Sequence, residues 1–232
     1  MTTENNTVEL KRLFDTGAHF AQVKSRRHPS MKPYLIGTKG RQEIIDLTQT
    51  AAQLEAAKSV MGTIAKEGKT ILFVGGKIEI AALVKKAANE IAAPFVATRW
   101  LGGTISNWGE IKKRIDRLAE LSEKDATGVR VKQHTKLELV HIEREKKRLE
   151  QRLDGLTTLT KRPDALLVVD TKHEKHAVKE ANDKGIPIIA IMSSDCDLHD
   201  ATYPIIANDS SRETVRFILS ELTNAFKKGQ IA

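Results

Sequence analysis

The chain has 232 residues and a formal net charge of +8, with 40% hydrophobic and 29% charged residues. That length supports one large core, or a core with an appendage, and that composition excludes a disordered chain. The excess of Lys and Arg indicates a polyanionic partner, either a nucleic acid or an anionic membrane surface.

Cysteine usage and the N-terminus indicate a cytoplasmic protein. Cys196 is the only cysteine, so an internal disulfide is excluded and a reducing compartment is expected. The first residues, MTTENNTVEL, lack the basic stretch and apolar run of a signal peptide. No apolar segment approaches the roughly 20 residues that span a bilayer, which predicts a protein outside the membrane.

The N-terminal region predicts a short helix followed by a basic, irregular segment. Residues 1–15 are polar and then amphipathic, which is consistent with a helix. Residues 16–42 contain no acidic side chain, and their prolines and glycines favour irregular chain or short strands. Residues 34–36 and 44–45, separated by a Gly-Thr-Lys-Gly stretch, are candidates for a small hairpin.

The rest of the body alternates between apolar strands and amphipathic helices. Continuous apolar runs, typical of buried parallel strands, occur at 70–74, 94–97, 165–169, 187–191 and 204–206. Apolar residues recur at helical spacing over 48–68, 80–91, 174–184 and 215–226. This alternation predicts an α/β fold with a parallel sheet and helices on both faces.

Residues 105–157 interrupt the alternation and contain no plausible strand. Apolar residues at heptad spacing begin at Trp108 and again at Leu139, on either side of a polar joint at 124–128. These two seams predict an antiparallel coiled-coil hairpin that projects from the body. The domain division expected is therefore an α/β sandwich of residues 1–104 and 158–232, with the hairpin inserted at 105–157.

The stretch RWLGGTISNW, residues 99–108, marks the junction between body and hairpin. Gly102 and Gly103 permit a sharp change of direction, and Ser106 or Asn107 is suited to cap the next helix. Because a glycine loop that opens a helix often holds a phosphate, this loop is also a candidate binding site.

Motifs for nucleotide chemistry are incomplete. Phe73-Val74-Gly75-Gly76-Lys77 follows a strand and opens a helix, as a phosphate loop does. A Walker A motif, however, requires glycine and Ser/Thr where Ile71 and Ile78 stand, and the third glycine of a dinucleotide motif is missing. A tight turn between strand and helix is the favoured interpretation.

The remaining candidates for catalysis or metal binding are also incomplete. His173 and His176 are three residues apart, whereas the helical zinc motif requires four. Cys196 and His199 make only half of a tetrahedral zinc site, and neighbouring acids raise the thiol pKa. Asp170 follows a strand at the edge where α/β sheets bind ligands, but an aspartate there more often caps the next helix. We predict no catalytic residue, no metal and no cofactor.

Nucleic-acid binding accounts better for the charges. Shape and phosphate recognition would dominate, because aromatic residues make up only 4% of the chain. Trp100 is a candidate for stacking on unpaired bases, as is Tyr34. The candidate RNA contacts are Lys24, Arg26, Arg27, Lys32, Lys39 and Arg41, then Arg99 and Trp100, and Lys112, Lys113 and Arg114 at the hairpin base.

Several separated motifs resemble one known family. They are Gly17-Ala18-His19-Phe20, Met31-Lys32-Pro33-Tyr34, Ile44-Ile45-Asp46-Leu47, Leu72-Phe73-Val74-Gly75, Arg99-Trp100-Leu101-Gly102-Gly103-Thr104 and Arg162-Pro163-Asp164-Ala165. In this order they resemble the bacterial small-subunit ribosomal protein two family over residues 8–228. The resemblance implies a flavodoxin-like three-layer α/β sandwich with a protruding coiled-coil hairpin. Arg27 stands where the family commonly has a tryptophan.

The resemblance also implies a function without catalysis. The expected partners are small-subunit ribosomal RNA and neighbouring small-subunit proteins, among them the large, multi-domain first protein, with no membrane and no small-molecule substrate. The leading hypothesis is thus a structural component of the small ribosomal subunit. The alternatives are a nucleotide-dependent enzyme on a Rossmann-like body, and a coiled-coil scaffold or membrane-surface adaptor that binds no RNA.

Overall fold

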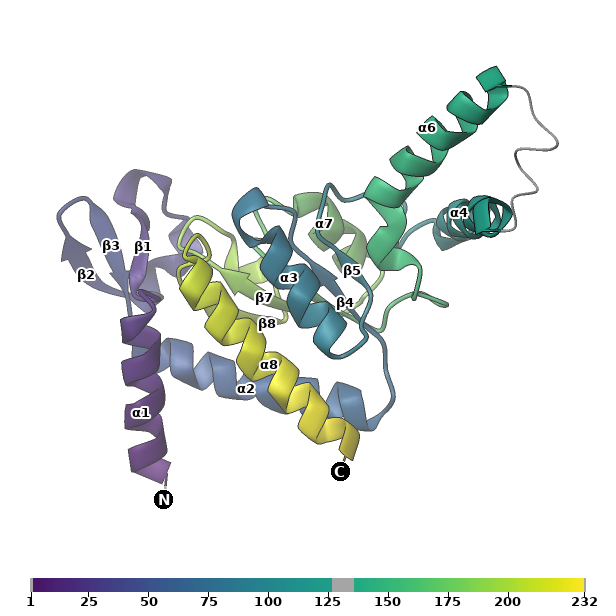
Figure 1. Ribbon diagram of the computed structural model, residues 1–232. Helices are drawn as coiled ribbons and strands as arrows, with labels where there is room; N and C mark the ends of the chain where they lie inside the picture. The colour runs from purple at the N-terminus through teal and green to yellow at the C-terminus, as the bar shows by residue number, and fades with distance from the viewer. Residues whose placement is uncertain (1, 127–135, 232) are drawn as a thin grey trace.

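The body of the molecule is a five-stranded parallel sheet (Figure 1). The computed structural model describes residues 2–126 and 136–231. In spatial order the strands are β5 (Phe95–Val96), β4 (Ile71–Val74), β6 (Ala165–Val169), β7 (Ile188–Met192) and β8 (Tyr203–Ile206). The predicted α/β class and all five predicted strands are confirmed. The chain moves outward from β4 to β5 and then returns to the other side of β4, which is one of the common doubly wound orders.

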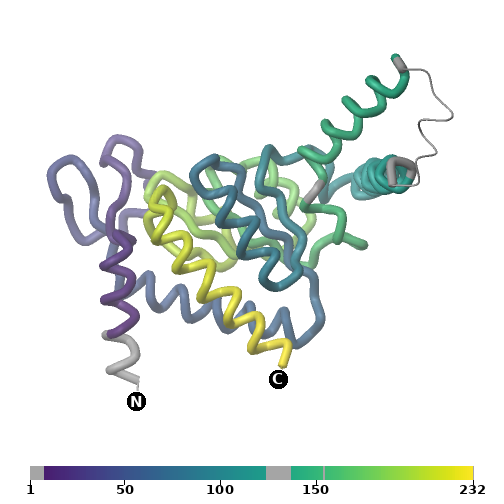
Figure 2. Tube along the Cα trace, viewed as in Figure 1, coloured from purple at the N-terminus to yellow at the C-terminus, as the bar shows by residue number. Residues whose placement is uncertain are grey.

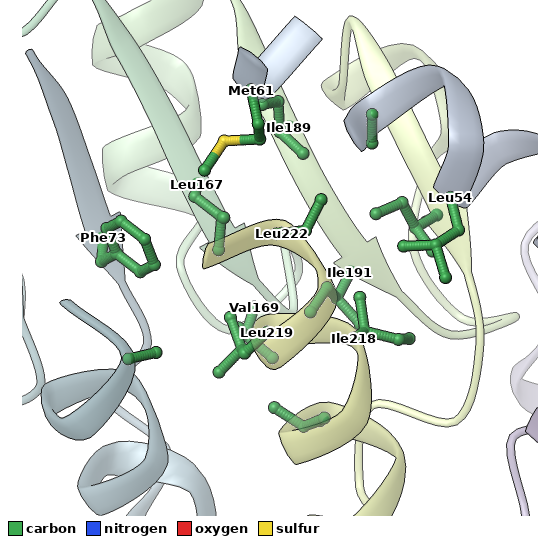
Figure 3. Close-up of a cluster of buried hydrophobic side chains, with 14 of the residues drawn as sticks. Leu54, Met61, Phe73, Leu167, Val169, Ile189, Ile191, Ile218, Leu219 and Leu222 are labelled. Carbon is green, nitrogen blue, oxygen red and sulfur yellow. The ribbon is translucent and has the colours of Figure 1, made fainter. Parts of the chain in front are cut away.

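Helices cover both faces of this sheet. Because neighbouring residues of a strand point to opposite faces, Phe73 contributes to one core and Leu72 to the other. The first core lies against α2 (Leu47–Lys66), α3 (Ile78–Glu90) and α8 (Arg212–Ile231). Figure 3 shows Met61 of α2 and Leu222 of α8 approaching the strand residues of this core.

The second core joins the sheet to the remaining segments. It contains residues of α7 (Lys175–Asp183), the first half of α4 (Trp108–Ala126), the end of α6 (Lys136–Leu153) and the 3-10 helix η3 (Asp154–Leu156). Leu153 and Leu156 are 1% exposed in it. The base of the projecting helices is thereby fixed to the sheet by apolar packing.

The N-terminal region forms a second, smaller sheet. After α1 (Thr2–Asp15), strands β1 (Phe20–Val23), β2 (Leu35–Lys39) and β3 (Gln42–Ile45) pair antiparallel in the order β1-β3-β2. The predicted hairpin is confirmed, with Leu35 opposite Ile45. The sequence did not reveal β1. Short 3-10 helices η1 (Lys24–Arg26) and η2 (Pro29–Tyr34) connect β1 to β2, and η4 (Leu198–Asp200) precedes β8.

Helices α4 and α6 project at the end of the molecule opposite the N-terminal sheet (Figure 2). Both predicted helices are present, and the seam residues of α4 that follow Trp108 (Ile111, Ile115 and Leu118) are buried. The joint predicted at 124–128 lies partly outside the described residues. Figure 1 draws α6 from the side and α4 nearly end-on, so their axes point in clearly different directions. The antiparallel coiled-coil pairing stays a prediction.

Candidate nucleic-acid interface

The glycine turn after β4 holds a carboxylate of the protein itself. Gly76 donates its backbone N–H to Oε1 of Glu174 at 2.8 Å, and Glu174 is 4% exposed. A Cβ atom on Gly76 would lie 2.4 Å from the carbonyl oxygen of Thr98, which explains the requirement for glycine. Since an anion already occupies the position that a phosphate would take in a nucleotide site, this turn is a structural connection.

Lys77, the next residue, is also neutralised internally. Its Nζ lies against Asp170 and 3.5 Å from Oδ2 of Asp209. Burial opposes the charged form of Lys77, but Asp209 and Asp170 outweigh it and raise the pKa of the ammonium group. Burial, followed by the charge of Asp170, raises the pKa of Asp209 to about 6. The lysine expected in a phosphate loop is therefore a partner for buried carboxylates.

Asp170 caps the turn before α7, as its position after a strand predicted. Its backbone is in the left-handed region, with φ of 65°, and its Oδ1 accepts the N–H of His173 at 3.1 Å. The carboxylate thus caps the turn that leads into α7. Next to this turn, at the carboxyl end of the sheet, lies a hollow of about 1040 Å³, lined in part by Lys77, Glu174 and Asp209.

Cys196 and His199 do not form a reactive pair. The thiol is buried, with Sγ 3.6 Å from Oδ1 of Asp170, whereas the His199 side chain is 85% exposed and lies 2.9 Å from Asp197. Burial first, and then Asp170, raises the pKa of Cys196 to about 12, so the thiolate nucleophile is suppressed. Asp170, Cys196 and Asp209 are close together, but the ammonium of Lys77 supplies the cation there.

The junction loop is organised around a second carboxylate, which is half-buried. Glu180 of α7 accepts the backbone N–H groups of Gly103 at 2.7 Å and Ile105 at 3.0 Å, and the N–H and hydroxyl of Ser106. Burial raises the pKa of Glu180, but these hydrogen bonds outweigh it and lower the pKa overall. Gly103 has φ of 94°, as the sharp turn requires. Here too an internal carboxylate fills a loop that resembles a phosphate site.

Trp100, predicted as a stacking residue, belongs to the protein interior in this structure. It is 6% exposed, and its indole N–H donates to Glu180 at 3.3 Å. A base would stack on it only after the loop rearranged. The neighbouring Arg99 is exposed and forms no ion pair with any described residue.

The predicted N-terminal cations surround the small sheet. Five of them are exposed and form no ion pair among the described residues: Lys24, Arg26, Lys32, Lys39 and Arg41. Arg27 differs, because its guanidinium lies 2.7 Å from Oε1 of Glu43, a residue only 2% exposed. Arg27 therefore balances a buried charge, and the other five offer a free surface to phosphates.

The remaining predicted cations lie on α4. Lys112, Lys113 and Arg114 are all exposed, and Lys113 lies 2.6 Å from Glu110. A groove between α4 and α6 is lined by Lys113 and Arg114 and also by Arg148 and Arg152 of α6, two residues that were not predicted from the sequence. Their four-residue spacing on one helix was the available signal, but the mixed charges of residues 143–148 concealed it.

These observations define a doubly wound α/β protein without an assembled catalytic centre in its described residues, and with cations concentrated on surfaces at both ends. No helix among the described residues has the length and apolarity to cross a membrane. A sequence model of the family described as Ribosomal protein S2 matches residues 13–229. The chain belongs to that family, and as a ribosomal protein it has a structural role and is not an enzyme.

Relatives with assigned names agree with this membership. Small ribosomal subunit protein uS2c of Rhodomonas salina is 37% identical over 222 residues, which are 96% of this chain and 91% of that protein. Small ribosomal subunit protein uS2 of Kocuria rhizophila is also 37% identical, over 96% of this chain and 78% of its own length. The uS2 protein of Dictyoglomus thermophilum is 39% identical, over 95% of this chain and 89% of its own.

Proposed function

We propose that the chain is a constituent of the small ribosomal subunit that binds ribosomal RNA through its surface cations. The observation that carries this proposal is the separation of two kinds of cation. Lys77 and Arg27 are paired with buried carboxylates. The exposed cations of the N-terminal sheet, and Lys112 and Arg114 of α4, form no ion pair among the described residues. Unpaired surface cations are available to phosphates, whose contact releases counterions and supplies affinity.

The proposed interface has two parts. The first consists of Lys24, Arg26, Lys32, Lys39 and Arg41 around the N-terminal sheet. The second consists of Arg99, Lys112, Lys113 and Arg114 near the base of the projecting helices. Arg27 and Trp100, which were also predicted to contact RNA, have structural roles in this proposal: Arg27 binds the buried Glu43, and Trp100 donates to the half-buried Glu180.

The names of the relatives, small ribosomal subunit protein uS2, support a place in the small subunit. A constituent of the small subunit contacts other small-subunit proteins, and we extend this to the large, multi-domain first protein of that subunit. In a bacterium these partners place the chain in the cytoplasm.

The proposed architecture divides the chain into a body and a hairpin that contains α4 and α6. We assign the body, residues 1–104 and 158–232, to a flavodoxin-like sandwich, on the strand order and on the helices of both faces. Residues 105–157 form a coiled-coil hairpin in this proposal. The ion pair between Arg117 and Glu145, at 3.6 Å, supports a contact between the two helices, although the axes of their described parts point in different directions.

Sedimentation tests the proposed function directly. A tagged chain expressed in bacteria is expected to migrate with small subunits in a sucrose gradient. A variant in which Lys24, Arg26, Lys39 and Arg41 are changed to Gln is expected to shift toward the top, because it loses phosphate contacts. The proposal fails if the wild-type chain stays at the top while intact small subunits are present in the same lysate.

A further inference from the structure

The groove between α4 and α6 collects more arginines than the sequence predicted. It has a volume of about 450 Å³ and is lined by five cations, Lys113, Arg114, Arg117, Arg148 and Arg152, and by two acids, Glu110 and Glu145. All five cations are exposed. The groove therefore carries an excess of positive charge at the surface.

The five cations differ in their pairing. Lys113 is paired with Glu110 at 2.6 Å, and Arg117 with Glu120 at 2.9 Å and Glu145 at 3.6 Å. Within the described ranges, Arg114, Arg148 and Arg152 form no ion pair. Glu110 and Glu145, the two acids of the groove, are paired with Lys113 and Arg117. The charge of Arg114 acts on Glu110 without forming an ion pair, and Arg148 and Arg152 form no ion pair with any carboxylate that the structure describes.

The geometry of α6 suits repeated anionic groups. Arg148 and Arg152 are four residues apart on one helix, which separates them by about 6 Å along its axis. Leu149 and Leu153 follow them on the same side of the helix and line the groove with apolar surface. Guanidinium groups present donors in a planar fork that fits phosphate oxygens in pairs. Two arginines at this spacing therefore suit successive phosphates of one strand.

The positive surface also continues beyond the groove. Arg152 lines a second hollow, of about 580 Å³, together with Arg99. Arg99 in turn lines the hollow at the carboxyl end of the sheet. Arg152 is thus shared by the groove and the second hollow, and Arg99 by the second hollow and the hollow at the sheet. Adjoining hollows of this kind fit an extended chain of phosphates better than a single small anion.

We propose that the groove between α4 and α6 is a phosphate clamp for the backbone of ribosomal RNA, formed by Arg114, Arg148 and Arg152. This inference rests on the proposed function, because it specifies how the end of the molecule opposite the N-terminal sheet holds the RNA. The inference assigns the contact to arginines of both α4 and α6, so that the RNA strand is bound from two sides of the groove.

The test compares two double variants of α6 with equal loss of charge. Arg148→Gln/Arg152→Gln removes two clamp residues, and Arg144→Gln/Lys147→Gln removes two exposed cations of the same helix that do not line the groove. Binding of the full chain to small-subunit ribosomal RNA is measured over a series of KCl concentrations. The clamp variant is expected to bind roughly 10- to 100-fold more weakly, and the slope of log affinity against log salt to fall by about 1.5.

The outcomes separate this inference from the proposed function. Equal losses of affinity and slope in the two double variants would overturn the clamp, because net charge alone would then explain binding. So would a clamp variant that binds RNA as tightly as the wild type but fails to enter small subunits, since an acidic protein would then occupy the groove. If the wild-type chain itself binds no ribosomal RNA, the proposed function fails instead. Equal thermal unfolding of both variants verifies that the fold is unchanged.

Discussion

The carboxyl end of the parallel sheet and the groove between α4 and α6 both contain cations and a hollow, but they use them differently. At the sheet, Glu174 accepts the backbone N–H of Gly76, and Asp209 pairs with Lys77. In a nucleotide site, both of these groups would bind a phosphate. In the groove, Arg148 and Arg152 form no ion pair with any residue that the structure describes. A concave basic site thus indicates a ligand only when its charges are not already satisfied within the protein.

The largest expected effect breaks the internal pairing at the sheet. Lys77→Met leaves Asp170 and Asp209 buried without their cation, so the free energy of unfolding should fall by about 3–5 kcal/mol. Lys175→Met removes an exposed cation nearby and should change it by no more than about 0.5 kcal/mol. Urea denaturation measures both variants. Similar losses in the two would show that Lys77 is not the counter-ion of this cluster.

The same cluster predicts an unusual dependence of stability on pH. The pKa of Asp209 is raised to about 6 in the folded protein, so between its unfolded pKa and about pH 6 the folded state binds more protons. Its contribution to stability is therefore present at low pH and lost as pH rises through that range, by at most about 3 kcal/mol. Glu180, with its lowered pKa, contributes in the opposite direction, since its stabilisation is lost as pH falls.

The variant Asp209→Asn isolates this contribution from that of other carboxylates. An amide does not titrate, so the variant should gain stability relative to the wild type as pH rises from about 4 to about 7. Urea denaturation at both ends of this range gives the difference. A constant difference between the two proteins would mean that Asp209 titrates normally in the folded state.

A smaller effect distinguishes cations within the N-terminal sheet. Arg27→Ala leaves Glu43 buried without its ion pair, and the free energy of unfolding should fall by about 1–3 kcal/mol. Lys24→Ala, at an exposed and unpaired residue, should leave stability within about 0.5 kcal/mol and act on RNA binding. Chemical denaturation and RNA titration of both variants make the comparison. If Arg27→Ala weakens RNA binding alone, the ion pair with Glu43 is not structural.

The fold was largely predictable from the sequence because its signals are local. The apolar run at 165–169 has the length that is typical of a buried strand, and the periodicity of 48–68 is typical of a helix with one buried face. β1 was missed because Phe20–Val23 has no clear alternation and because β3, its partner, lies about twenty residues further along. The alternation of apolar and polar residues within one strand does not indicate which distant strand it pairs with.

The site was predicted less completely because its contacts are distant in sequence. Glu174 binds Gly76, which lies 98 positions earlier in the chain. Glu180 binds Gly103, which lies 77 positions earlier. Nothing local distinguishes these glutamates from surface residues, so the two loops resembled open phosphate sites. Arg27 and Trp100 resembled their exposed neighbours for the same reason, and only the fold reveals which charges and rings are buried.

The smallest expected effect on stability falls at the boundary between the two regions. Arg99 is exposed, unpaired with any described residue, and lines both adjoining hollows. Arg99→Glu should leave the free energy of unfolding within about 0.5 kcal/mol and reduce the salt slope of RNA binding by about 1. Lys86→Glu, an equal charge reversal on α3, is the control for overall charge, and RNA titration at several salt concentrations compares them. If both reversals reduce the slope equally, the RNA path does not reach the sheet, and the clamp between α4 and α6 ends at Arg152.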